Sequence, residues 1–226
     1  MTLPAPTILL DLDGTLIDSE PGIVSSCRAA IESLGLAMPE RTEIARLIGP
    51  PITDVMAYLL EGQGEHRVEE AVAAYREDYG RRGILDCAPY PGIEQALGAL
   101  HTGGARLVLA TSKRRDFAIR ILDRLGFSPL FSAVYGSSLG AASAHKDAMI
   151  AGIVRDLSLD PNRAVMVGDR RFDVAGAHAN AIRTIGVLWG YGTADELTAA
   201  GAERLIAQTR ELTLDAVART LGRSAG

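Results

Sequence analysis

Short apolar runs recur along the chain, and between them apolar residues return every three or four positions. The first run, Thr7–Asp13 ("TILLDLD"), does not alternate apolar with polar residues, which is typical of a strand buried on both faces. Similar runs predict further strands at Ala105–Thr111, Ser132–Ser137, Ala164–Asp169 and Thr184–Gly190. Helical spacing predicts helices at Asp116–Leu125, Lys146–Leu157 and Asp173–Asn180. Because strands alternate with helices, we expect the α/β class, with a parallel sheet covered by helices on both faces.

The stretch 17–85 departs from this alternation, because it contains no candidate strand. The turn Ala88–Gly92 ("APYPG") then restores the α/β pattern. We therefore expect an all-helical insert at 17–85 within a core formed by 1–16 and 86–226. Apolar residues at helical spacing predict its four inner helix faces: Ile23, Cys27, Ala30, Ile31 and Leu34; Ile44, Leu47 and Ile48; Val55, Met56, Leu59 and Leu60; Val68, Val72, Tyr75 and Tyr79.

Single residues mark the ends of these predicted helices. Ser19 is a candidate N-cap of the first helix, since a hydroxyl can accept a hydrogen bond from an unpaired backbone N–H. Gly35 suits the end of that helix, where a left-handed residue is common. Pro51 can open the third helix, because its missing N–H is not needed there.

The composition narrows the classes of protein that fit this pattern. The chain has 226 residues, of which 47% are hydrophobic, enough for one domain with an insert. No apolar run approaches the roughly 18 residues that cross a bilayer, and the first residues do not resemble a signal peptide, so we expect a cytoplasmic protein without a membrane partner. The net charge is −5 with scattered basic residues, which argues against nucleic-acid binding. Cys27 and Cys87 lie outside any zinc-binding spacing and are expected to be reduced thiols.

Aspartates stand at the carboxyl ends of two predicted strands. Asp11 and Asp13 end the first strand, and Asp169 and Asp173 follow the strand that begins at Ala164. In open α/β sheets the ligand site lies beyond these strand ends. Carboxylates packed together repel one another and lose hydration, so they need a cation or a proton.

Three more polar features complete the pattern. Thr111, Ser112 and Lys113 end the second core strand, and Lys146 opens a helix. Lys113 and Lys146 are the only lysines among the 23 basic residues. A single aspartate after a strand is more often a turn former or N-cap, but the combination of all these residues is far more specific.

The sequence resembles the haloacid dehalogenase superfamily of hydrolases. "DLDGTLIDSE", "LATSK", Lys146 and "GDRRFD" correspond to its four motifs, and the resemblance covers nearly the whole chain. It implies a Rossmann-like core, with the helical insert as a mobile cap. "GPP" after "RLI", and "DVAGAHANAIRTIGVLWGYG", look most like the phosphoglycolate phosphatase-type branch. One difference is Asp147, which follows Lys146 where many relatives have proline.

The resemblance implies a role for each motif residue in the hydrolysis of a phosphate monoester. Asp11 would be the nucleophile that forms an aspartyl-phosphate, and Asp13 the general acid and base. Thr111 and Lys146 would hold the transferring phosphoryl group. Mg²⁺ would be held by Asp11, the backbone carbonyl of Asp13, Asp169 and Asp173, and further substrate contacts would come from Gly14, Thr15, Ser112, Lys113 and Gly49.

Several residues have a simpler reading. Lys113 could reach the phosphate, or it could be a solvated residue at a helix start, and both remain open. Arg46 is more simply a surface residue, and Trp189 and Tyr191 are more simply packing residues. Gly49 is expected to place the insert's loop near the core. The four histidines show no metal-ligand spacing.

Other functions remain as alternatives to a phosphoglycolate phosphatase-like enzyme. A nucleoside monophosphate phosphatase (5′-nucleotidase-like) is nearly as plausible, and a sugar-phosphate mutase is less so because Gly49–Ile52 lacks an arginine. A dehalogenase would not need Asp13, and phosphonoacetaldehyde hydrolysis would need a lysine in 17–85, which has none. The non-enzymatic alternative is a regulatory protein that binds a phosphorylated ligand. A small phosphorylated metabolite is the expected partner, and the oligomeric state cannot be read.

Overall fold

The structure, a computed structural model, describes residues 5–137 and 145–222. Residues 1–4, 138–144 and 223–226 of the predicted core, including the start of the segment considered for a signal peptide, lie outside the described residues.

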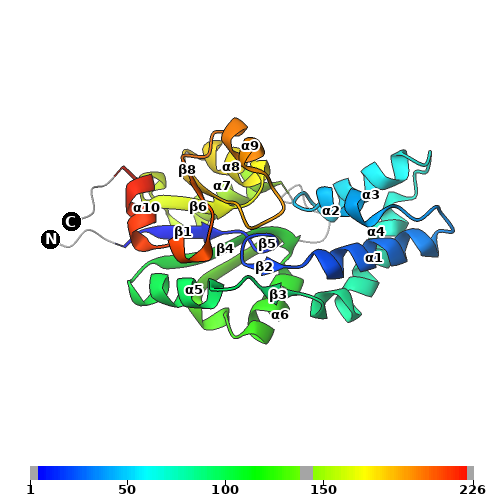
Figure 1. The fold of residues 1–226 in the computed structure, drawn as a ribbon, viewed down its shortest axis with the longest axis horizontal. Coiled ribbons are helices and arrows are strands. Elements are labelled where there is room, and N and C mark those ends of the chain that lie inside the picture. Colours follow the sequence, from blue (N-terminus) through cyan, green and yellow to red (C-terminus); the bar gives the residue numbers. More distant parts are fainter. Residues whose placement is uncertain (1–4, 138–144, 223–226) are drawn as a thin grey trace.

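A six-stranded sheet forms the centre of the larger lobe (Figure 1). Its strand order is β5-β4-β1-β6-β7-β8, and every neighbouring pair is parallel. The strands are β1 (Thr7–Leu10), β4 (Arg106–Arg114), β5 (Phe131–Ser137), β6 (Ala164–Gly168), β7 (Arg183–Val187) and β8 (Arg204–Ile206). The parallel α/β sheet predicted from the apolar runs is therefore confirmed.

Helices cover both faces of this sheet, because successive side chains of each strand point to opposite sides. Ile8 and Leu10 of β1 pack on one side with α5 and α6, whereas Leu9 packs on the other with α7 and α8. All three strand residues are fully buried. The helices of this lobe are α5 (Ile93–Thr102), α6 (Arg115–Leu125), α7 (Lys146–Leu157), α8 (Arg171–His178), α9 (Ala194–Ala199) and α10 (Leu214–Thr220).

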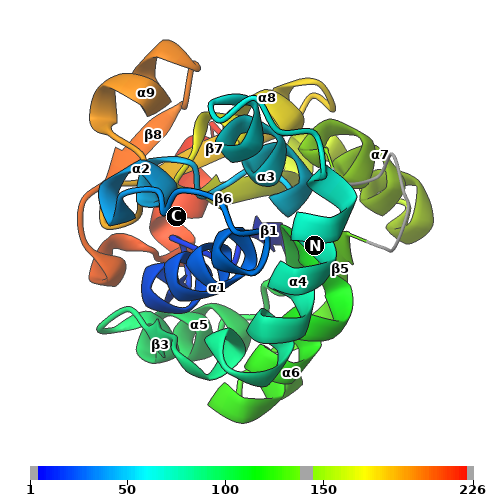
Figure 2. The ribbon, with the colours of Figure 1, turned by 90° about the vertical axis from the view of Figure 1, so that its right-hand side faces the viewer.

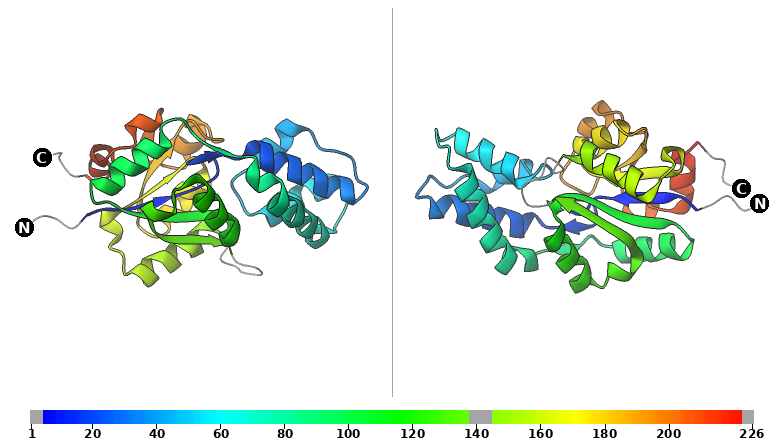
Figure 3. Two further views of the ribbon diagram at one scale, coloured as in Figure 1. Left: turned by 90° about the horizontal axis from the view of Figure 1, so that it is seen from below. Right: turned by 180° about the vertical axis from the view of Figure 1, so that it is seen from behind.

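Four helices form a second lobe beyond the carboxyl end of β1 (Figures 1 and 3). They are α1 (Glu20–Ser33), α2 (Arg41–Arg46), α3 (Ile52–Glu61) and α4 (Val68–Arg81). Figure 2 views this lobe end-on, with α4 beside α1, against which it packs. Ile31, Ile44, Met56, Leu60 and Tyr79 are buried in its core, as the helical spacing predicts.

Two short strands cross between the lobes. β2 (Ile17–Asp18) pairs antiparallel with β3 (Ala88–Pro89). The expectation that 17–85 holds no strand is thus wrong for its first two residues, because they are extended and pair with the returning chain. A two-residue strand leaves no periodicity that could reveal it.

The predicted ends of several elements shift by a few residues. β4 continues through Arg114, so Lys113 lies on a strand and not at a helix start. β7 ends at Val187, because Leu188–Tyr191 turns back toward the carboxyl end of β6. Gly35 lies just beyond α1 with φ +70°, as expected for a helix end. Ser19 occupies the N-cap position of α1, but its side chain makes no capping bond.

Candidate active site

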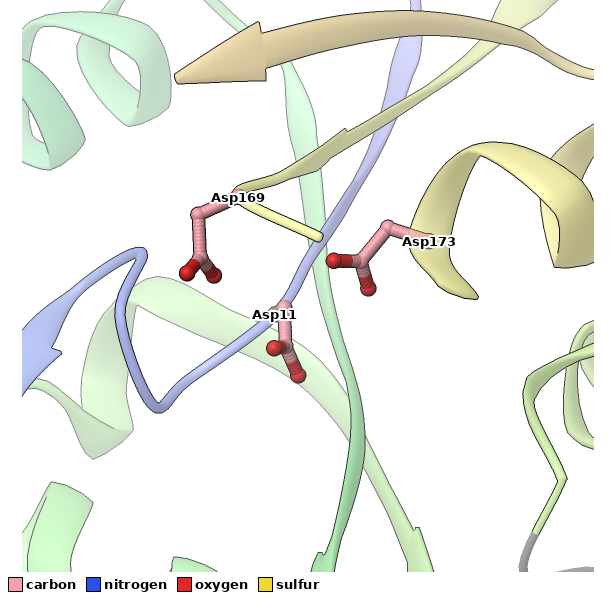
Figure 4. A group of neighbouring side chains, drawn as sticks. All are labelled: Asp11, Asp169 and Asp173. Carbon is pink, nitrogen blue, oxygen red and sulfur yellow. The ribbon is translucent and has the colours of Figure 1, made fainter. Parts of the chain in front are cut away.

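Three aspartates meet at the carboxyl ends of β1 and β6. Asp11 follows β1, Asp169 follows β6, and Asp173 lies on the first turn of α8. Figure 4 shows their side chains directed toward one another, and one oxygen of each lies within 4.8 Å of those of the other two. All three are buried. The predicted convergence of these strand ends therefore holds.

Lys146, at the start of α7, is the cation beside this group. Its Nζ donates to Asp11 Oδ1 at 2.9 Å and to the carbonyl oxygen of Ala110 at 2.8 Å, and it lies 2.8 Å from Asp173 Oδ1. Burial disfavours the charged amine, but Asp11 and Asp173 outweigh that effect and raise the pKa of Lys146. A permanent positive charge is therefore fixed on one side of the aspartates.

Asp169 is not among the partners of Lys146. Its Oδ1 accepts from the Thr15 hydroxyl at 3.1 Å and its Oδ2 from the Tyr191 backbone N–H at 2.8 Å. Burial, followed by the charges of Asp173 and Asp11, raises the pKa of Asp169 to about 8. Burial likewise raises the pKa of Asp11 to about 6, although Lys146 opposes the shift. The single positive charge of Lys146 thus does not balance the negative charge that the three ionised carboxylates would carry.

Asp13 lies on the approach to this group and has a different set of partners. Both of its oxygens accept from Lys113 Nζ at 2.8 Å, and Oδ1 also accepts from the Ser19 hydroxyl at 2.5 Å. The Lys113 side chain is only 5% exposed, and its Nζ lies 4.6 Å from the ring centre of Tyr79. Of the two readings left open for Lys113, a solvated residue is therefore wrong.

Glycines after β7 allow the chain to pass tightly against Asp169. A Cβ on Gly190 would lie 2.2 Å from the carbonyl oxygen of Gly14, and one on Gly192 would lie 1.9 Å from that of Asp169. Trp189 donates to the carbonyl oxygen of Thr15 at 3.0 Å. The interpretation of Trp189 and Tyr191 as packing residues is incomplete, because the backbone N–H of Tyr191 holds Asp169. The alternation of aromatic residues with glycine in "WGYG" was the available signal.

A cavity of about 700 Å³, counted out to its open mouth, lies between the two lobes. Residues of the larger lobe that line it include Asp11, Asp13, Thr111, Ser112 and Lys113. Helical-lobe residues that line it include Ile23, Ile48, Gly49, Pro50, Ile52, Val55, Tyr75, Arg76 and Tyr79. The loop at Gly49 therefore lines the same cavity as Asp11 and Asp13, as expected.

Two of the residues predicted to contact the substrate lie outside this cavity. Gly14 and Thr15 do not line it, and their backbone N–H groups donate to the carbonyl oxygens of Ile17 and Leu12. The tight turn after β1, with Gly14 at φ +82°, uses these donors itself. Arg46 is exposed, as its reading as a surface residue requires.

Residues 8–187 match the haloacid dehalogenase-like hydrolase family, and the chain belongs to this family. It is 42% identical over 188 residues to "Tyrosine-protein kinase PtkA" of Mycobacterium tuberculosis, covering 83% of this chain and 64% of that protein. The chain therefore spans less than two thirds of the length of that relative. It is 38% identical to a "5′-nucleotidase" of Pseudomonas aeruginosa, covering 86% of this chain and 87% of the relative.

Two further relatives carry phosphatase names. A "Phosphoglycolate phosphatase, plasmid" of Cupriavidus necator is 32% identical, covering 91% of this chain and 90% of the relative. The solved structure of a "predicted phosphatase" from Clostridium acetobutylicum superposes with a TM-score of 0.86 and is 32% identical, covering 93% of this chain and 97% of that chain. The Rossmann-like core expected from the family resemblance is thus confirmed. Among the residues that the structure describes, no helix combines the length and apolarity needed to cross a membrane.

Proposed function

We propose that this protein is a Mg²⁺-dependent phosphatase that hydrolyses small phosphate monoesters through an aspartyl-phosphate on Asp11. The observation that carries the proposal is the position of Asp11, which borders both the cavity and the group of buried carboxylates. A carboxylate there can attack a phosphorus atom in the cavity without first losing a proton, once its ionised form is stabilised. A cytoplasmic location belongs to the proposal, and two free cysteines support it.

The chemistry of the aspartates fits a magnesium ion. All three side chains offer hard oxygen ligands, and within the described residues the donors to Asp169, the Thr15 hydroxyl and the Tyr191 backbone N–H, are neutral. Burial, followed by the charges of Asp173 and Asp11, raises the pKa of Asp169, and a bound cation would offset both effects. Asp11, Asp169 and Asp173, with the backbone carbonyl of Asp13, would hold the ion. When bound, Mg²⁺ would neutralise charge on the transferring phosphoryl group.

The chain's own residues would carry out two displacements. In the first, an Asp11 oxygen bonds to phosphorus while the bond from phosphorus to the alcohol oxygen breaks, and Asp13 gives that oxygen a proton. In the second, water attacks phosphorus, the bond to Asp11 breaks, and Asp13 takes the water's proton. Lys146 and Thr111 would steady the phosphoryl oxygens.

Lys113 would change partners during such a cycle. Its Nζ lies 2.8 Å from Asp13, and an incoming phosphate would compete for this ammonium group and leave the Asp13 carboxyl free to face the leaving oxygen. Lys113 and Ser112, which line the cavity, would thus contact the substrate.

We also propose that 17–85 is a cap that opens and closes over Asp11, with 1–16 and 86–226 as the catalytic core. The hinges would be Leu16–Asp18 and Ile84–Ala88. Closure would exclude bulk water while the aspartyl-phosphate forms on Asp11, and opening would release the alcohol. The position of Gly49 on the cavity wall supports this role.

A direct test uses p-nitrophenyl phosphate. The wild type should release nitrophenol with Mg²⁺ and not with excess chelator, and Asp11→Asn should lose essentially all activity while keeping its thermal melt. Near-normal turnover by folded Asp11→Asn would overturn the role of Asp11, and a wild type without any turnover would favour the phospholigand-binding alternative. A panel of phosphate monoesters would separate phosphoglycolate from nucleoside monophosphates as substrates.

A protein tyrosine kinase is the second candidate, because of the 42% identity to a relative with that name. The two functions leave different covalent products on the chain. An aspartyl-phosphate is cleaved by hydroxylamine and disappears in Asp11→Asn, whereas phosphotyrosine resists hydroxylamine. Incubation with labelled ATP and with labelled acetyl phosphate, followed by hydroxylamine treatment, distinguishes them.

A further inference from the structure

Arg76, on α4, is an unpartnered cation that lines the cavity. Four other arginines of 17–85 form ion pairs: Arg41 with Glu20, Arg67 with Glu65, Arg81 with Glu77 and Arg82 with Asp78. Within residues 5–137 and 145–222, Arg76 has no ion pair, and its buried Nε has no hydrogen-bond acceptor. A buried donor without an acceptor costs free energy, which a ligand can recover by accepting its proton.

A second guanidinium borders the same cavity. Arg114, at the end of β4, lines it and lies over the ring of Phe117, with its central carbon 4.2 Å from the ring centre. Asp116 accepts from both Nε and Nη2 of Arg114, which fixes the direction of the guanidinium and leaves Nη1 to donate to a further acceptor. Burial, followed by the positive charge of Arg114, lowers the pKa of Arg76. An anion in contact with both guanidinium groups would relieve this repulsion.

Contacts between α4 and α6 hold Arg76 in place relative to the larger lobe. The rings of Tyr79 and Phe117 lie 5.4 Å apart, and Arg120 donates to the carbonyl oxygen of Gly80 at 2.9 Å. Arg76 lies one helical turn before these anchors. In this arrangement of the two lobes Arg76 is therefore held at the cavity wall, which lowers the entropy cost of binding an anion there.

The rest of the helical-lobe wall is mostly apolar. Ile23, Ile48, Ile52 and Val55 line the cavity and offer no charge to a substrate. The cavity thus has one polar end at Asp11 and Lys113 and another cationic site at Arg76 and Arg114, with an apolar wall. Guanidinium groups bind carboxylates and phosphates through paired hydrogen bonds.

We propose that Arg76, with Arg114, binds a second anionic group on the alcohol part of the substrate. The substrate class is then a small phosphate monoester with a carboxylate or a further phosphate a few atoms from the reacting phosphorus. This inference rests on the proposed phosphatase function. It assigns specificity to α4, whereas Gly49–Ile52 contributes shape.

The test compares three phosphate monoesters of similar size: 2-phosphoglycolate, ethylene glycol bisphosphate and 2-hydroxyethyl phosphate, whose alcohol part carries no charge. The measured quantity is the ratio of kcat/KM for each compound with a second anionic group to that for 2-hydroxyethyl phosphate. We expect the wild type to prefer at least one compound with a second anionic group about tenfold or more, and Arg76→Met to reduce that ratio about ten- to hundredfold. The compound with the higher ratio shows whether the second anionic group that the site prefers is a carboxylate or a phosphate.

Two variants make the result specific. Arg81→Met removes an exposed arginine of the same helix that pairs with Glu77, and it should keep the wild-type ratio. Arg76→Lys should retain part of the preference, because it keeps the charge and loses the planar fork. An unchanged ratio in Arg76→Met, a wild-type ratio near one, or a preference for nucleoside monophosphates that Arg76→Met leaves unchanged would overturn the inference. Failure to hydrolyse any of the three, or p-nitrophenyl phosphate, would instead count against the phosphatase function.

Discussion

Magnesium binding should release about one proton per ion at neutral pH. The buried carboxylates Asp169 and Asp11 have pKa values raised to about 8 and about 6 in the absence of metal. At pH 7 the first group is about nine-tenths protonated and the second about one-tenth, so together they carry about one proton. Because a metal binds the ionised carboxylates, that proton must leave when the ion enters.

The sign of the pH dependence follows from the same two groups. At pH 9 only about one-tenth of a proton remains on the two carboxyls, so Mg²⁺ binding should release almost none.

The stability of the metal-free protein should also depend on pH. Between about pH 4 and pH 8 the folded state holds protons that the unfolded state has already lost, so the free energy of unfolding should fall as pH rises through this window. Saturating Mg²⁺ should remove most of this decline.

Titration calorimetry measures the number of protons directly. Mg²⁺ is titrated into the chelator-treated protein at pH 7 and pH 9, each in two buffers with different ionisation enthalpies, and the difference in observed heat gives the protons released. Asp215→Asn, which alters an exposed carboxylate paired with Arg219, should match the wild type. Asp169→Asn should bind the ion weakly or release far fewer protons at pH 7. Measurable Mg²⁺ binding that releases no proton at pH 7, or the same number at both pH values, would refute this reasoning.

Three further predictions concern single side chains. Gly190→Ala should lower the Tm by at least several degrees, because its Cβ would lie 2.2 Å from the Gly14 carbonyl oxygen. Gly98→Ala, whose Cβ would lie in open space, should raise the Tm slightly. Thermal melts that rank the two variants the other way would contradict the packing argument. Lys146→Met should abolish turnover and destabilise the fold by about 3–5 kcal/mol, because two buried carboxylates lose their cation; urea unfolding within about 1 kcal/mol of wild type would count against this pairing. Pro50→Ala should change the ranking of substrates while p-nitrophenyl phosphate is still hydrolysed, and an equal loss for every compound would contradict a role in specificity.

The sequence predicts most of the sheet because its strands are buried on both faces and leave uninterrupted apolar runs. The same positions show where the strands end, and the family resemblance assigns Asp11 and Asp169 to one site. β8 escaped prediction because it has three residues at the sheet's edge and only one of them is buried. The helix α5 was missed although its buried residues Ile93, Ala96, Leu97 and Leu100 have helical spacing.

The partners of each site residue were harder to predict than their positions. Motif resemblance could suggest roles for Asp13 and Lys113, but only the fold shows that the two form an ion pair across a separation of 100 residues. The contact of Tyr191 with Asp169 depends on a tight return of the chain that no local preference encodes. The use of the Gly14 and Thr15 backbone donors within their own turn was equally hidden.

The antiparallel pairing of β2 with β3 also makes the helical lobe a transplantable unit. Ile17 lies opposite Pro89 and Asp18 opposite Ala88, so the chain leaves for the lobe and returns from it on neighbouring strands. Neighbouring strands lie about 4.8 Å apart, a gap that a two-residue turn can close. A gene fusion that replaces 19–87 with such a turn, or with another helical hairpin, would not need to rearrange the sheet or the group of Asp11, Asp169 and Asp173, but it would remove the Ser19 hydroxyl that donates to Asp13. The lobe that lines one side of the cavity could therefore be exchanged while these three aspartates stay in place.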